Sequence, residues 1–151
     1  MMRNVNLKNK NIAIFTVESF LAYRQSNTLS IMDYKFINTE YLDSVSAGDP
    51  EIICELVTLF KEQSTEISEE MKLLFDAKNY KLLGLLAHKA KSSVSIMGMN
   101  DLATMLKTFE LQAREEKEPH LYESYIDRFR NETMEAITEL EDLSNKLLNR
   151  N

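Results

Sequence analysis

The sequence has few of the residues that interrupt helices or build tight turns. Its 151 residues include only three glycines and two prolines, and there is no tryptophan. Residues with high helix propensity are abundant, above all leucine, glutamate, lysine and methionine. This composition favours a chain that is helical throughout. The length is sufficient for one domain with a substantial core and too short for two.

Several functional classes lack support in the sequence. The net charge of −6 disfavours nucleic acid as a partner, because neutralising phosphates requires a basic surface. No apolar run approaches the ~20 residues that span a bilayer, and the single cysteine, Cys54, fits a reducing compartment. The two histidines, His88 and His120, are too far apart in the sequence to suggest a metal site. We therefore expect a cytoplasmic protein without metal, cofactor or membrane association.

Residues 1–31 differ in composition from the rest of the chain. They are rich in asparagine and serine, show poor hydrophobic periodicity, and carry four basic residues against one acidic residue. The short apolar piece 12–17 is followed by Glu18, which argues against a secretory signal. We interpret 1–31 as a flexible tail or as an extension from a false start, with translation beginning at Met32. A functional arm is the alternative, and residues 32–151 form the predicted domain.

Apolar residues recur at steps of three and four residues in four long stretches of the remaining chain, which predicts amphipathic helices. These stretches span residues 50–75, 80–97, 100–114 and 120–148. Short connections between long helices imply antiparallel neighbours. The sequence therefore predicts an all-α, antiparallel up-down-up-down four-helix bundle. A short N-terminal helix that ends near Ser46 is expected to cap one end of it.

Capping residues mark the ends of these helices. Asp49 followed by Pro50 is a preferred helix start, and Gly98 is a natural stop for the second long helix. Side-chain caps are also expected from Asn38 or Thr39, Asn79 and Asn100. The residues expected to face the core on the second long helix are Leu82, Leu83, Leu86, Ala90, Val94 and Met97, and those on the short helix are Tyr41, Leu42 and Val45. The methionines predicted as core filler are Met97, Met99 and Met105.

His88 lies on the helix face opposite the core positions. Its neighbours one turn away are Gly84, Lys91 and Ser92, which are small or cationic, so the imidazole is expected to be exposed. Glycine in mid-helix costs about 1 kcal/mol relative to alanine, and we interpret Gly84 as clearance beside His88 for an approaching protein. A neutral imidazole is a competent nucleophile near neutral pH. His120, which follows a proline at a helix start, is expected to be an ordinary surface residue.

The chain resembles the histidine-containing phosphotransfer (HPt) domain family at five positions: His88, Lys91, Ser92, Ser93 and Gly98. The family pattern is histidine, lysine three residues on, small residues at four and five, and glycine at ten. The family usually has glycine where this chain has Ser92. Residues that match the next helix of the family are Leu102, Leu106, Phe109 and Glu110. The resemblance covers roughly residues 35–148.

This resemblance implies a phosphoryl carrier of a multistep His–Asp phosphorelay. His88 would accept a phosphoryl group from the receiver domain of a hybrid sensor kinase and pass it to a response regulator, or the reverse. Lys91 would offset the phosphoryl charge, and Glu110 would orient the ring. Auxiliary contacts to the phosphate or partner are expected from Gly84, Lys89, Ser92 and Ser95, with Lys81 adding positive field. The family uses Nε2, but the residues themselves leave the ring nitrogen open.

Two other functional classes fit the same sequence. A helical adaptor that is never phosphorylated would bind a receiver domain or another helix through the His88 face. A purely structural bundle or coiled-coil dimer would associate through the 120–148 helix, whereas the carrier is expected to be a monomer. The chain has no glycine-rich phosphate loop and no room for an ATP-binding kinase domain. We therefore expect a phosphoryl carrier and not a kinase.

Overall fold

A computed structural model describes residues 34–150, which form five α-helices and one short 3₁₀ helix with no β-strand among them. The helices are α2 (Thr39–Ser46), α3 (Pro50–Asp76), α4 (Tyr80–Ile96), α5 (Asn100–Arg114), η1 (Pro119–Leu121) and α6 (Tyr122–Leu148). The predicted all-α bundle is confirmed. The interpretations of residues 1–31 and of a start at Met32 lie outside the described residues.

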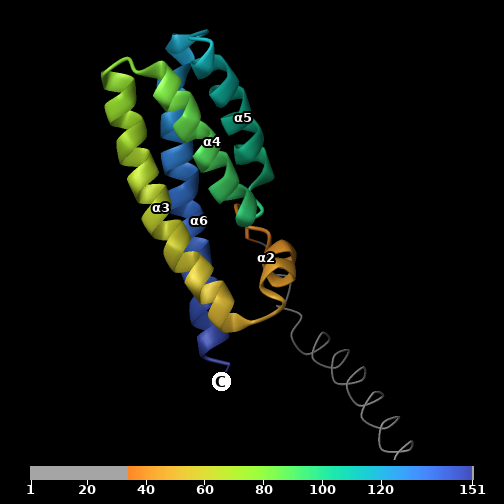
Figure 1. Cartoon of the computed structure of the whole chain (residues 1–151). Helices are drawn as coiled ribbons and strands as arrows, with labels where there is room; N and C mark the ends of the chain where they lie inside the picture. Colours follow the sequence, from red (N-terminus) through yellow and green to blue (C-terminus); the bar gives the residue numbers. More distant parts are fainter. Residues whose placement is uncertain (1–33, 151) are drawn as a thin grey trace, which may run out of the picture. The chain divides into compact units, whose positions relative to one another are not determined.

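The four long helices pack in a ring, each against the next, with α3 also contacting α6. Their connections are short, so neighbouring helices are antiparallel. Helices α3 and α6 have 27 residues each, whereas α4 has 17 and α5 has 15. Figure 1 shows that α3 and α6 extend past one end of α4 and α5, and that α2 lies at that end, beyond the first turn of α5. Helix α2 therefore caps the bundle, as predicted.

The core lies between the four long helices and is almost entirely apolar. Its largest fully buried side chains include Phe60, Phe109, Tyr122, Phe129, Ile53, Ile67, Met71, Leu83, Leu102 and Leu106. Fully burying each such side chain stabilises the fold by roughly 1.5–3 kcal/mol. The three methionines predicted as core filler are buried as well, which confirms that expectation. None of the helices in residues 34–150 combines the length and the hydropathy that a membrane span requires.

Local signals in the sequence set most of the helix ends. Asn38, Asp49 and Asn79 each accept a hydrogen bond from the first turn of the helix that follows, as predicted. Gly98 has a φ of +71°, a left-handed conformation that favours glycine. A Cβ at Gly98 would also lie 2.6 Å from the Cβ of Asn38, so this glycine lets the segment before α2 approach the α4–α5 turn.

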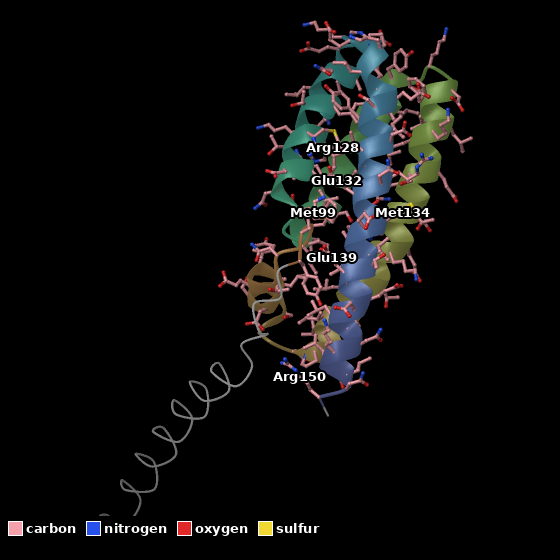
Figure 2. All side chains as sticks on the ribbon, turned by 180° about the vertical axis from the view of Figure 1, so that it is seen from behind. Met99, Arg128, Glu132, Met134, Glu139 and Arg150 are labelled. Carbon is pink, nitrogen blue, oxygen red and sulfur yellow. The ribbon has the colours of Figure 1, made fainter. Side chains whose placement is uncertain are left out.

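The segment before α2 is tied to α6 by two carboxylates. Glu139 accepts hydrogen bonds from the backbone N–H groups of Lys35, Phe36 and Ile37, at 2.8, 2.9 and 3.2 Å. The Tyr34 hydroxyl also donates to Asp142, at 2.6 Å. Glu139 lies on the stretch of α6 that runs past α2 and the start of α5 (Figure 2). These bonds fix where the chain enters the bundle.

Three predictions about the helices are wrong in detail. Leu82, expected in the core, is 49% exposed because it precedes the buried Leu83 by one residue, and about 100° of helical rotation turns it outward. Tyr41 and Val45 are exposed because α2 buries only the edge that carries Leu42. Asn100 is the first residue of α5 and does not cap it; Met99 occupies the cap position and makes no side-chain cap bond.

Candidate functional site

His88 stands in the middle of α4 with its side chain 54% exposed. The buried stripe of α4 lies on the opposite side and includes Leu83, Ala87, Ala90 and Val94. This division follows from the 3.6-residue period of the helix, which turns every third or fourth residue to the same face. The predicted exposure of the imidazole is confirmed.

The Nδ1 atom of His88 is held by a carboxylate on the neighbouring helix. Glu110 of α5 places both of its oxygens 3.0 Å from His88 Nδ1. The Glu110 side chain is only 7% exposed, and it contacts two further donors: Lys91 Nζ at 3.2 Å from Oε2 and an Arg114 guanidinium nitrogen at 2.9 Å from Oε1. A buried carboxylate is thus shared by an imidazole and two permanent cations.

These partners keep Glu110 ionised. Burial alone raises the pKa of a carboxyl group, but hydrogen bonds from His88 and Lys91 and the charge of Lys91 outweigh it, so the pKa of Glu110 lies below its ordinary value of 4.5. An ionised carboxylate only accepts hydrogen bonds, so Nδ1 must carry the proton. The neutral ring then has its lone pair on Nε2, the nitrogen that Glu110 does not occupy.

Lys91 lies beside both the ring and the carboxylate. Its Nζ is 3.5 Å from His88 Nδ1, but an ammonium and an N–H group are both donors, so this contact is proximity and the hydrogen bond of Lys91 goes to Glu110. The Lys91 side chain is 26% exposed. An ammonium in this position places positive charge beside the nucleophile without blocking Nε2.

Comparison with protein families identifies the domain that contains this arrangement. The sequence model of the Hpt domain family matches residues 55–146, from the first turns of α3 to the last turns of α6, and includes the whole His88 site. The chain belongs to the Hpt domain family. Hpt domains are histidine-containing phosphocarrier modules of phosphorelays and interact with receiver domains and response regulators. No curated protein and no solved structure matches the chain at the significance required.

The small and basic residues around His88 in this Hpt domain do not all lie as the sequence suggests. Lys89 and Lys81 are exposed on α4. The hydroxyl of Ser92 donates to the carbonyl of His88 at 3.3 Å, and that of Ser95 donates to the carbonyl of Lys91 at 2.7 Å. Both serine hydroxyls therefore bond to their own helix and would have to rotate away to reach a phosphate.

Gly84 serves a different purpose from the one predicted. It is buried and faces α5, where a Cβ would lie 2.9 Å from Arg114 Cγ and 3.1 Å from both the Arg114 nitrogen and the Glu110 carbonyl oxygen. The interpretation of Gly84 as clearance for an approaching protein is wrong. The missing side chain instead allows the backbones of α4 and α5 to approach closely, and this approach brings Glu110 to His88.

Replacing Gly84 by alanine should lower the free energy of unfolding by about 1 kcal/mol. Alanine favours the helix by about 1 kcal/mol, but forcing a methyl group against the backbone of α5 costs about 1–3 kcal/mol. Urea titration would measure the change, with Leu85→Ala as the control, because Leu85 is the next residue and is 53% exposed. A Gly84→Ala variant more stable than the wild type would show that the two helices separate easily at this point.

Arg114 is the residue of the site that the sequence interpretation missed. It lies four residues after Glu110, a spacing at which oppositely charged side chains meet on one helix face. This Glu-x-x-x-Arg pattern is visible in the sequence, but it is common on solvent-facing helices. Only the packing of α5 against α4 shows that Glu110 is buried and shared with His88.

The other histidine has no comparable surroundings. The His120 side chain is 70% exposed, and it lies 3.4 Å from the carboxylate of Glu118. The expectation that it is an ordinary surface residue agrees with this placement. Within residues 34–150, no group of three or more histidine, cysteine and acidic side chains is arranged to hold a metal ion.

Proposed function

We propose that this protein carries phosphoryl groups on Nε2 of His88. It would receive them from the aspartate of a hybrid sensor kinase's receiver domain and deliver them to a response regulator, or transfer them in the opposite direction. The observation that supports this most directly is an exposed imidazole whose Nδ1 is held by a buried carboxylate. We further expect the protein to work as a monomer in the cytoplasm.

The chemical step needs little beyond positioning. The lone pair of Nε2 attacks the phosphorus of the aspartyl phosphate, and the bond between phosphorus and the aspartate oxygen breaks, so that the aspartate leaves as a carboxylate with the electron pair. Nδ1 keeps its proton, and the positive charge that develops on the ring is offset by Glu110, 3.0 Å away. Delivery to the regulator is the same displacement in the opposite direction.

Lys91 is the electrostatic group of the proposed reaction. Its ammonium starts 3.2 Å from Glu110 and beside the imidazole, and its flexible stem allows it to turn toward a phosphoryl group on Nε2. It would offset the charge of the three phosphoryl oxygens as they pass between the two proteins. We assign auxiliary contacts with the partner or the phosphate to Lys89, Ser92 and Ser95, which lie at the surface that the partner approaches.

Replacing Lys91 by alanine should slow phosphoryl transfer by about 100-fold without abolishing it, since a single well-placed donor contributes on the order of 10²–10³ in rate. Single-turnover transfer from a phosphorylated receiver would measure this effect. Lys61→Ala is the matched control, because it removes another lysine–glutamate pair between helices, the 2.6 Å contact to Glu141. Equal transfer rates for Lys91→Ala and Lys61→Ala would show that Lys91 is only a surface charge without a role in transfer.

The function itself is tested by incubating the full chain with a phosphorylated receiver domain. We expect one phosphoryl group per chain, bound as a phosphoramidate that is labile in acid and stable in alkali. A non-phosphorylated adaptor would bind the receiver without acquiring this label. A structural bundle would show neither binding nor label, and it would assemble with increasing concentration. Either result would overturn the proposal.

A further inference from the structure

Two cations divide the oxygens of Glu110 between them. Lys91 contacts Oε2 at 3.2 Å, and Arg114 contacts Oε1 at 2.9 Å, while His88 Nδ1 lies 3.0 Å from both oxygens. A carboxylate that is 7% exposed needs at least one such partner, because burial penalises an unpaired charge. One cation is enough to offset the buried charge of Glu110, so the second can leave without exposing an unpaired carboxylate.

The proposed reaction would take one of these partners away. If Lys91 turns to the phosphoryl group on Nε2, its hydrogen bond to Glu110 is lost. Arg114 is positioned to keep its ion pair with Glu110 when Lys91 leaves. Its Cγ lies against α4 at the position where a Cβ of Gly84 would be only 2.9 Å away, so the stem of Arg114 fills the space that the glycine leaves. From there its guanidinium reaches Glu110 along α5, on the oxygen that Lys91 does not use.

We infer that Arg114 is a positioning residue for phosphoryl transfer, which holds the Glu110 carboxylate against His88 Nδ1 while Lys91 moves to the phosphoryl group. This inference rests on the proposed function. Gly84 takes part indirectly, since it provides the room in which the Arg114 stem lies. Without Arg114, Lys91 would be the only permanent cation on a buried carboxylate and would be held back from the phosphoryl group.

The alternative is an ordinary surface ion pair, which contributes about 0–1 kcal/mol to stability and nothing to transfer. The chain contains a matched example. Arg128 and Glu132 form a pair on α6 with the same four-residue spacing, and the Arg128 side chain is 44% exposed against 45% for Arg114. Figure 2 shows Arg128 and Glu132 one turn apart on α6. Arg128→Gln therefore removes the same kind of pair outside the site.

The first measurement is independent of phosphorylation. The tautomer of the neutral His88 ring can be determined by ¹⁵N NMR in the wild type, Arg114→Gln and Arg128→Gln. The charged groups around it are Lys81, Lys89 and Lys91 on α4 and Glu110 and Arg114 on α5; within residues 34–150 no charged side chain of α3, which also packs on α4, pairs with it. Without Arg114 the Glu110 carboxylate should be held less firmly at Nδ1, so a detectable share of the neutral rings should carry the proton on Nε2 in Arg114→Gln alone.

The second measurement is the single-turnover rate of transfer from a phosphorylated receiver. Arg114→Gln should be about tenfold slower than the wild type, Arg114→Lys should recover most of the rate, and Arg128→Gln should be unchanged. Lys91→Ala should cost less in the Arg114→Gln background than in the wild type, because Lys91 is already held by Glu110 there. Two residues that acted independently on transfer would instead give additive effects.

The outcomes separate this inference from the proposed function. A shift of the ring proton toward Nε2 in Arg114→Gln together with a selective loss of rate supports Arg114 as a positioning residue. An unchanged tautomer, or a transfer rate equal to that of Arg128→Gln, overturns it while leaving His88 as the phosphoryl acceptor. A failure of all the proteins to accept phosphate, the wild type included, overturns the proposed function and this inference with it.

Discussion

Replacing His88 by glutamine should abolish phosphoryl uptake completely while leaving the bundle folded. The glutamine side chain has no nucleophilic nitrogen, and no other histidine in residues 34–150 has a carboxylate at its Nδ1. The His88 side chain is 54% exposed and contributes little to the core, so the free energy of unfolding should change by about 0.5 kcal/mol or less. Receiver-dependent labelling and circular dichroism would measure the two effects.

The matched control for this variant is His120→Gln. It removes the only other histidine of the chain, which is exposed and lies in η1, between α5 and α6. The His120→Gln protein should be labelled like the wild type. Undiminished labelling of His88→Gln would place the acceptor on another residue. Loss of labelling in both variants would indicate a common effect on docking or folding and would refute His88 as the sole acceptor.

Replacing Glu110 by glutamine should destabilise the protein by about 2 kcal/mol at neutral pH. The change preserves shape and can still accept a hydrogen bond from His88 Nδ1, but it removes the charge that Lys91 and Arg114 share. Breaking a fully buried ion pair costs about 3–5 kcal/mol. The cost is smaller here because the side chains of Lys91 and Arg114 are 26% and 45% exposed and can turn to water.

This difference in stability should shrink in acid. The pKa of Glu110 is lower in the folded protein than its ordinary value, so the unfolded chain takes up the proton first as the pH falls. The stabilisation by Glu110 is therefore complete above the unfolded pKa of 4.5 and is lost as the pH falls through the lower folded value. Glu110→Gln has no proton to bind at this position, and its stability lacks this contribution at every pH.

Urea titrations of the wild type and Glu110→Gln at neutral pH and at several acidic pH values would test both statements. Glu132→Gln is the control, since Glu132 pairs with Arg128 at 2.6 Å on the surface of α6 and is 24% exposed. That variant should lose 1 kcal/mol or less. A difference between the wild type and Glu110→Gln that stays constant down to strongly acidic pH would mean that the pKa of Glu110 is the same in the folded and the unfolded protein.

The fold could be predicted from the sequence because its signals are local. Asp49 before Pro50, Asn79 and Gly98 mark helix ends through bonds within a few residues, and these predictions hold. The spacing of apolar residues determines which face of each helix is buried, as for Phe109 on α5. Errors appear at the margins of these faces. Leu82 lies one residue from the buried stripe, where the exact placement of a neighbouring helix decides burial.

The candidate site could be predicted only in part. His88 and Lys91 lie three residues apart on one helix, so their proximity follows from helix geometry alone. The pairing of His88 with Glu110 joins positions 22 residues apart on different helices and depends on the relative register of α4 and α5. The resemblance to a family suggested this pairing, and the structure supplied its geometry.

Gly84 and Arg114 show what sequence periodicity cannot decide. A position near the edge of a helical face can turn toward solvent or toward a neighbouring helix, and the sequence interpretation placed Gly84 toward solvent. The structure turns it toward α5, because the absence of a Cβ allows the two backbones to approach there. The same close approach buries Glu110 and converts an ordinary Glu-x-x-x-Arg surface pair into part of the His88 site.

The helices, most of their caps, most of the buried stripes and the exposure of His88 follow from the order of the residues, since each depends on interactions within a few turns of one helix. The contact at Nδ1 of His88, and the burial of Glu110 between Lys91 and Arg114, follow from the packing of α4 against α5. The physical reason is that burial and hydrogen-bond partners across a helix interface depend on the register and separation of two helices. Side chains from both helices set these quantities together.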